Sequence, residues 1–267
     1  MSLVRKIQGN AVCEKHGPYS YSAFQSGRRV LGKTCPACLH DVQLRLVELS
    51  QAKESRARDA LWAQRLQQAR IPAAFLQSTF DNYQLASSHL AGKNAQVIRQ
   101  YADNFADVLA TNPATGMVLF GFPGTGKTHL ACALIRQLIA SGHTARYVSI
   151  PTMLHELKEG GRGNHESGAS VQLRELSEVQ MLVMDEYGAH TRTEMDYQLL
   201  FQVVNARYER NLPTALVTNV QMASLTAELD QRFLERVMGL QCPKLAFKWG
   251  SYRAGHLPND HYEKDMA

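Results

Sequence analysis

Short apolar runs alternate with amphipathic stretches along the chain from about residue 76 onward. The apolar runs predict strands over residues 116–121, 145–150, 180–188, 213–219 and 244–249. Between them, apolar positions at helical spacing predict helices over residues 94–111, 128–142 and 196–211. Such alternation is typical of a parallel sheet with helices on both faces, so we predict an α/β fold for this part of the chain.

A long stretch without Gly or Pro precedes the alternating region. Residues 39–70 are rich in helix-forming residues, and apolar side chains recur at helical spacing at Leu39, Val42, Leu46 and Leu49. Pro72 ends this helix, because proline cannot continue one. We therefore expect a small N-terminal module over residues 1–70, a large domain over residues 71–254 and a tail over residues 255–267.

Charge is distributed unevenly along the 267 residues. Residues 1–75 carry 12 Lys and Arg against 5 Asp and Glu, whereas residues 76–267 carry 17 against 19. The basic segment fits nucleic acid, an acidic protein surface, or simply a solvated helix face. No apolar run reaches about 18 residues and none follows the basic N-terminus, so we expect a cytoplasmic protein without a membrane span.

The N-terminal module contains two short pairs of metal-ligand residues. The pattern C-x₂-H-x₁₈-C-x₂-C is formed by Cys13, His16, Cys35 and Cys38. Each pair can span one edge of a tetrahedron around Zn²⁺, and His40 could replace His16 as the fourth ligand. The remaining cysteines, Cys132 and Cys242, stand alone in apolar surroundings, which favours a reducing cytoplasm over a disulfide framework. We predict a zinc site that stabilises a segment too short to fold well alone.

A glycine-rich motif lies between the first predicted strand of the large domain and the helix that follows. It matches G-x-x-x-x-G-K-[ST], in which backbone N–H groups and a helix N-terminus surround phosphate oxygens. Lys127 would reach the β- and γ-phosphates, and Thr128 would hold Mg²⁺. The predicted phosphate-binding residues, with the histidine that follows the motif, are Gly121, Phe122, Pro123, Gly124, Thr125, Gly126, Lys127, Thr128 and His129.

Polar residues at the ends of two later strands complete this candidate site. Asp185 and Glu186 end the apolar run 180–188, at the strand edge where open α/β sheets bind ligands. We expect Asp185 to contact the Mg²⁺ and Glu186 to polarise the attacking water. Asn219 ends the next strand and could help to position that water. The sequence lacks the N-K-x-D guanine signature, so ATP is favoured over GTP.

These motifs together resemble an AAA+ ATPase, and two further stretches narrow the resemblance to bacterial helicase loaders of the DnaC type. The stretches are residues 229–239, "LDQRFLERVMG", and residues 247–253, "FKWGSYR". The resemblance implies that Arg236 is an arginine finger reaching a neighbour's nucleotide and that Arg232 lies at the same interface. It also implies that Arg253 contacts the protomer's own nucleotide. Fourteen residues follow Arg253, so we expect no helical lid.

The resemblance implies an ATP-dependent loader that places a hexameric replicative DNA helicase on single-stranded DNA. ATP binding would drive self-assembly into a spiral, hydrolysis would release it, and the zinc-bearing module would grip the helicase. We expect the region 151–179 to face DNA through Lys158 and Arg162, with a mobile loop over residues 159–170. The alternatives are a transposition helper of the IstB type, and a zinc-containing adaptor that binds nucleotide with little turnover.

Overall fold

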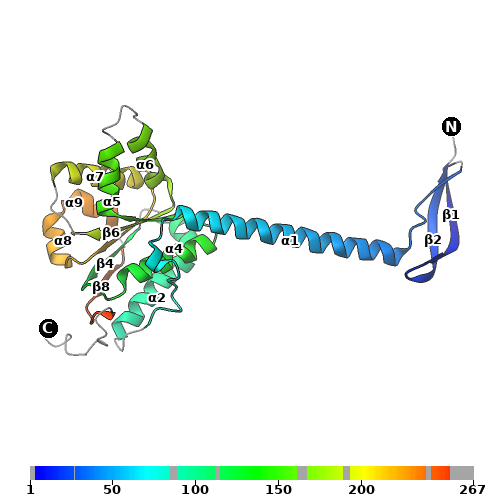
Figure 1. Cartoon of the computed structure of the whole chain (residues 1–267), viewed down its shortest axis with the longest axis horizontal. Helices are drawn as coiled ribbons and strands as arrows, with labels where there is room; N and C mark the ends of the chain where they lie inside the picture. Colours follow the sequence, from blue (N-terminus) through cyan, green and yellow to red (C-terminus); the bar gives the residue numbers. More distant parts are fainter. Residues whose placement is uncertain are drawn as a thin grey trace. The chain divides into compact units, whose positions relative to one another are not determined.

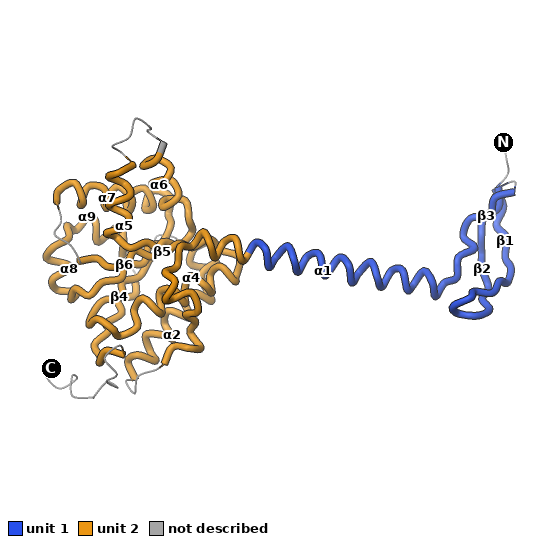
Figure 2. The backbone as a smooth tube through the Cα atoms, in the orientation of Figure 1, with its two compact units in different colours: residues 1–61 blue, residues 62–267 orange. Residues whose placement is uncertain are grey.

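The computed structural model describes residues 4–26, 28–84, 89–111, 115–160, 167–188, 193–238 and 242–252. The chain forms two compact units, Met1–Leu61 and Trp62–Ala267, which are coloured separately in Figure 2. Helix α1 (Pro36–Gln68) contributes residues to both units, and it confirms the helix predicted over residues 39–70. The domain boundary expected after residue 70 stays a prediction.

The first unit contains a small antiparallel sheet that the sequence analysis did not anticipate. Its strands β1 (Arg5–Cys13), β2 (Gly17–Ser26) and β3 (Arg29–Leu31) pair in the order β1-β2-β3. Cys13 pairs with Gly17 at the β1–β2 turn, where Gly17 has a φ of +78°. The signal was the alternation of Tyr19, Tyr21 and Ala23 with polar residues, which has the period of a strand.

The second unit is built on a five-stranded parallel sheet. Its strands follow the order β5-β6-β7-β4-β8, and every pair of neighbours is parallel, which confirms the predicted α/β fold. All five predicted strands are present, as β4 (Met117–Gly121), β5 (Ala145–Ser149), β6 (Met181–Tyr187), β7 (Thr214–Thr218) and β8 (Lys244–Phe247).

Helices cover both faces of this sheet, and Figure 1 shows the two layers. Strand residues alternate between the two cores: Met117 and Leu119 pack on one side, and Val118 and Phe120 on the other. One core contains α2 (His89–Asp103), α3 (Phe105–Thr111) and α4 (Lys127–Ala140). The other contains α5 (Ile150–Gly160), α6 (Ser167–Glu178), α7 (Glu194–Glu209), α8 (Met222–Glu228) and α9 (Gln231–Met238).

Two predicted elements differ from the structure. The helix expected over residues 94–111 is two helices, because the chain breaks between α2 and α3 at Asn104. The mobile loop expected over residues 159–170 was wrong at both ends, since α5 continues to Gly160 and α6 begins at Ser167; residues 161–166 lie outside the described residues. Among the described helices, none has the length and apolar character needed to cross a membrane.

Candidate nucleotide-binding and metal-binding sites

The glycine-rich motif forms a tight loop between β4 and α4. Gly121, Gly124 and Gly126 have φ values of +126°, +77° and +90°, a region that side chains with a Cβ rarely adopt. At Gly121 an added Cβ would also lie 2.3 Å from the carbonyl oxygen of Phe247 on the neighbouring strand β8. Both the backbone conformation and the lack of space therefore require glycine at this position. The loop also directs the N-terminus of α4 toward the predicted phosphate position, here called the phosphate cradle.

Lys127 lies inside this loop rather than on the surface. It is 5% exposed, and its Nζ donates to the carbonyl oxygens of Gly121, at 2.9 Å, and Phe122, at 2.6 Å. A phosphate group in the cradle would compete for the same ammonium protons. The lysine is thus held where the motif requires a cation.

Thr128 and Asp185 meet behind the loop. Thr128 Oγ1 donates to Asp185 Oδ2 at 2.8 Å, and the Tyr147 hydroxyl donates to the same oxygen at 3.1 Å. Asp185 is 5% exposed, and this burial raises its pKa. A buried carboxylate next to a hydroxyl is the oxygen donor set that Mg²⁺ prefers, so the residues fit the ion.

Glu186 follows Asp185 at a bulge in β6, where the pairing with β7 shifts register between Met184 and Tyr187. Its φ is +65°, which is uncommon for a residue with a side chain. Glu186 N donates to Asp185 Oδ1 at 2.7 Å, and Ser149 Oγ donates to Glu186 Oε2 at 2.6 Å. The bulge turns this carboxylate out of the strand, and Ser149 at the end of β5 holds it.

Asn219 directly follows β7 and is exposed at the same carboxyl edge of the sheet. Because β6 and β7 are neighbouring parallel strands, Asn219 lies at this edge together with Asp185 and Glu186. His129 lies in the first turn of α4, and its ring nitrogens contact Ser78 Oγ at 3.3 Å and Thr79 O at 3.0 Å. His129 therefore connects α4 to the segment before α2.

Sequence reasoning missed the residues that cover the loop. The Tyr83 hydroxyl and Trp249 Nε1 each donate to the Thr125 carbonyl oxygen at 3.1 Å. Tyr252 N donates to the Gly124 carbonyl oxygen at 2.9 Å. Tyr147 and Ser149 were missed as well, because they look like ordinary strand residues. Their place in the site follows only from strand pairing, because β5 pairs with β6 so that Ser149 lies opposite Asp185.

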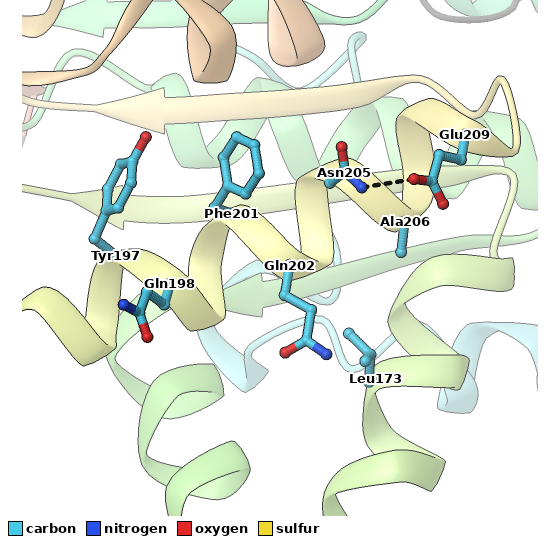
Figure 3. Close-up of a pocket in the computed structure, with 8 residues that line it drawn as sticks. All are labelled: Leu173, Tyr197, Gln198, Phe201, Gln202, Asn205, Ala206 and Glu209. Carbon is cyan, nitrogen blue, oxygen red and sulfur yellow. Dashed lines mark hydrogen bonds between the residues drawn. The ribbon is translucent and has the colours of Figure 1, made fainter.

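The two described arginines of the predicted interface lie on α9. Arg236 Nε donates to Asn205 Oδ1 at 2.7 Å, and its guanidinium lies 5.0 Å from the ring centroid of Phe201. Asn205 and Phe201 line a pocket of about 430 Å³ on α6 and α7 (Figure 3). Arg232 is exposed and lies 3.4 Å from Asp230. Arg253, like Arg162, lies outside the described residues.

The four predicted zinc ligands come together in the first unit. Their ligand atoms all lie within 4.8 Å of one another, with Cys13 Sγ 3.5 Å from Cys38 Sγ. His16 Nδ1 lies 3.3 Å from Cys38 Sγ and 3.8 Å from Cys35 Sγ. Sulfur ligands around a tetrahedral Zn²⁺ are about 3.8 Å apart, so the donors fit the ion. The geometry selects His16 over His40, which is outside the cluster.

Groups around the cluster suit thiolate and imidazole ligands. Backbone N–H groups of Lys15 and His16 donate to the Cys13 sulfur and lower its pKa to about 6. His16 Nε2 lies 3.2 Å from Asp41 Oδ2, which fixes the ring so that Nδ1 faces the sulfurs. Asp41 in turn pairs with Lys15. The β1–β2 turn, the start of α1 and the Asp41 carboxylate thus orient the four ligand side chains.

Comparison with known proteins agrees with this geometry. The family described as IstB-like ATP binding protein matches residues 42–256, most of the chain. The chain belongs to this family. It is 28% identical to the replicative helicase loader DnaC of Escherichia coli K12 over 176 residues, which cover 66% of this chain and 69% of that protein.

Solved structures show the same fold in the second unit. The DnaC helicase loader structure has a TM-score of 0.57 and 21% identity, covering 66% of this chain and 100% of that chain. The DnaI structure has a TM-score of 0.54 and 21% identity, covering 68% and 94%. The core of this family member is therefore an AAA+ P-loop fold, and it carries a cysteine–histidine cluster outside that core.

Proposed function

We propose that this IstB-like ATP-binding protein hydrolyses ATP and loads a replicative DNA helicase onto single-stranded DNA. The observation that carries the ATPase assignment is the Thr128–Asp185 contact of 2.8 Å behind the glycine-rich loop, with Glu186 beside it. The loader assignment is supported by the relatives named replicative helicase loader, whose similarity spans 66% of the chain. ATP binding would drive assembly of the protein on the helicase, and hydrolysis would release it.

Each residue of the site has a distinct task in this proposal. Lys127 and the backbone N–H groups of the loop would bind the phosphates, and Thr128 and Asp185 would hold a Mg²⁺ that supplies positive charge against the phosphates. Glu186 accepts a hydrogen bond from the attacking water and polarises it. Asn219 orients the same water, and Arg236 of a neighbouring protomer stabilises charge on the transferred phosphoryl group.

The helicase contact is proposed for the first unit. The part of α1 within it exposes an apolar stripe, with Leu39, Val42, Leu46 and Leu49 between 50% and 67% exposed. Exposed apolar side chains at helical spacing suit a groove on a protein partner. The zinc site would hold the start of this helix against the sheet through Cys35 and Cys38.

Of the two cations expected to contact DNA in the region 151–179, Lys158 is described by the structure and Arg162 lies outside the described residues. Lys158 forms an ion pair with Asp196 of α7, and this pair is the main reason that the pKa of Asp196 falls to about 2. Lys158 is therefore engaged in joining α5 to α7. A DNA phosphate would compete with Asp196 for the Lys158 ammonium, so the proposed DNA contact of this region depends more on Arg162 than on Lys158.

Co-purification tests the choice of partner. A tagged chain is expressed in its host and captured with ATP, and the replicative helicase should be retained. A Leu46→Glu, Leu49→Glu variant should fail to capture the helicase. The control, an Arg56→Glu, Arg58→Glu variant altered further along α1, should capture more helicase than that variant does. Capture of a transposase without helicase would favour the transposition helper that the family description also fits. Absence of ATP turnover in the presence of helicase and DNA would favour an adaptor.

A further inference from the structure

The sheet of the first unit carries a concentration of positive charge. Residues 1–34 contain a single acid, Glu14, and six cations: Arg5, Lys6, Lys15, Arg28, Arg29 and Lys33. Two of these cations are engaged within the unit. Lys15 pairs with Asp41, and the Lys33 ammonium lies 5.4 Å from the ring centroid of Tyr21. The charge that is available to a partner therefore belongs mainly to the other four.

These four cations gather at the end of the sheet away from the zinc ligands. Arg5 and Lys6 begin β1, whereas Arg28 and Arg29 lie at the β2–β3 turn, and all four are exposed. Lys6 and Cys13 are seven residues apart on β1, which corresponds to about 24 Å along an extended strand. The basic end and the zinc site are thus separate features of one small sheet.

One face of this basic end is open and contains an aromatic ring. Phe24 pairs with Lys6 on one side and with Leu31 on the other, and Arg29 pairs with Ser26 two residues further along β2. Directly paired side chains lie on the same face of an antiparallel sheet, so Lys6, Phe24, Arg29 and Leu31 share one surface, here called the Phe24 face. Phe24 is 55% exposed and Leu31 is 69% exposed.

The opposite face of the sheet is covered. Ala23 there is fully buried, and the Tyr19 hydroxyl donates to the Lys33 carbonyl oxygen at 2.8 Å. The segment after β3 therefore packs over Tyr19, Tyr21 and Ala23 and leaves the Phe24 face to a partner.

We propose that the Phe24 face binds single-stranded nucleic acid. An exposed aromatic ring on a sheet stacks on an unpaired base, and flanking cations pair with the phosphates on either side. Phe24 would be the stacking residue, and Lys6 and Arg29 the phosphate contacts, with Arg5 and Arg28 adding attraction at longer range. A base inside a duplex cannot reach Phe24, so single strands are preferred. The apolar stripe of α1 is a separate surface and lacks this density of positive charge.

The test uses the full-length, zinc-loaded protein without ATP, in a Lys127→Ala background that removes nucleotide-dependent assembly. Fluorescence anisotropy with a labelled 20-nucleotide oligo-dT measures binding at several salt concentrations. Each phosphate contact to a single strand contributes about 0.7 to the slope of log K against log salt. The Lys6→Ala, Arg29→Ala variant should therefore lose about 1.4 of slope and bind at least about 10-fold more weakly.

The stacking residue has a separate signature. Phe24→Leu keeps an apolar side chain and should bind roughly 5- to 150-fold more weakly with an unchanged slope, the range expected for one base–aromatic stack. Phe24→Trp should bind nearly as wild type. The matched control is Arg56→Ala, Arg58→Ala, which removes the same charge from the exposed surface of α1 and should leave affinity within about 2-fold.

Zinc content checks that each variant retains the folded unit. Equal weakening by the α1 control and by the Lys6, Arg29 variant would overturn the proposal in favour of diffuse charge attraction. Equal affinity for duplex and single strands would also overturn it. So would intact oligonucleotide binding by the Lys6, Arg29 variant with loss of helicase capture, because the face would then bind an acidic protein surface.

Discussion

Glu186 is the residue whose local structure depends most on its neighbours. Its φ of +65° costs roughly 1 kcal/mol or more for a residue with a side chain. Asp185 accepts its backbone N–H and Ser149 donates to its carboxylate, so the strained conformation is held from two sides. The result is a carboxylate that leaves the strand at the edge where the glycine-rich loop lies.

This geometry gives a clear expectation for two substitutions. Glu186→Gln should bind ATP normally but lose most hydrolysis, because an amide cannot polarise water as a carboxylate does. Lys127→Ala should fail to bind ATP, since the loop loses the cation held at its centre. Labelled-nucleotide binding and phosphate release measure the two properties separately. Normal turnover by Glu186→Gln would contradict the proposed role of this residue.

Residue-level prediction worked where the chemistry is local in sequence. The spacing from Gly121 to Thr128 was sufficient to identify the loop, and Asp185 stood out as an acid ending an apolar strand. Ser149 and Tyr147 had no such signal, because their contacts to the site arise from the pairing of β5 with β6. The sequence indicated His16 as the fourth ligand and left His40 as an alternative, and the β1–β2 turn brings His16 to the cysteines.

At the scale of elements, apolar runs identified every strand of the parallel sheet, most clearly β4, β6 and β7, which are buried on both faces. The strands of the first unit were missed because their sheet is largely exposed and lacks such runs. The break at Asn104 was missed because the apolar spacing continues across it from α2 into α3. A glycine-rich composition suggested a loop at residues 159–170, yet packing of α5 and α6 on the sheet extends helix into both of its ends.

One buried side chain joins several of these elements. Arg207 of α7 is fully buried, and it donates to the carbonyl oxygens of Leu176, Val179 and Pro213 at 2.6–2.8 Å. Burial lowers its pKa to about 9, yet the group remains protonated at neutral pH. Its guanidinium thereby connects α7 to the end of α6 and to the start of β7.

Arg207→Met should therefore destabilise the second unit by at least about 3 kcal/mol, because several buried carbonyl oxygens lose their donor. The loss is measured by urea unfolding followed through tryptophan fluorescence, since Trp62 and Trp249 both belong to that unit. Arg210→Met, at the exposed C-cap of the same helix, is the control and should change stability by less than about 0.5 kcal/mol. Similar losses in both variants would show that the buried contacts contribute little.

The zinc site gives a prediction for the first unit. A Cys35→Ser, Cys38→Ser variant should lose its zinc and the fold of the sheet, because Ala23 and Cys35 are its main buried apolar side chains. Elemental analysis should find one zinc per wild-type chain and none in the variant, with tryptophan fluorescence of the second unit unchanged.

The histidines supply the control for this experiment. His40→Ala should retain zinc, whereas His16→Ala should weaken zinc binding, because His16 provides the fourth ligand atom. Freshly purified wild-type protein without zinc would refute the site.

At the scale of the whole molecule, the chain combines a unit with a glycine-rich phosphate cradle and a unit whose sheet carries a cysteine–histidine cluster that fits Zn²⁺. Within the second unit, Arg236 is bound to Asn205 and stacked on Phe201 of α7, and not to the protomer's own glycine-rich loop. Asn205 Nδ2 donates to Glu209 at 2.8 Å (Figure 3), which leaves the amide oxygen to accept from Arg236 Nε. Arg236 is therefore not engaged by its own loop, and the proposed action on a neighbouring protomer's nucleotide stays a prediction.

If Arg236 acts in trans, Arg236→Ala should bind ATP with near-normal affinity, because its own phosphate cradle is unchanged. It should fail in hydrolysis, since loss of an arginine finger costs roughly 10³-fold or more in turnover. Mixing it with the Lys127→Ala protein should partly restore turnover, because an intact cradle on one chain then meets an intact arginine on the other. Each variant is inactive alone, so rescued phosphate release can come only from a site shared between chains. The control mixes Lys127→Ala with Glu186→Gln, which leaves no chain with both Lys127 and Glu186 and should show no rescue. Failure of the first mixture, with both proteins folded and co-assembled, would remove Arg236 from the reaction.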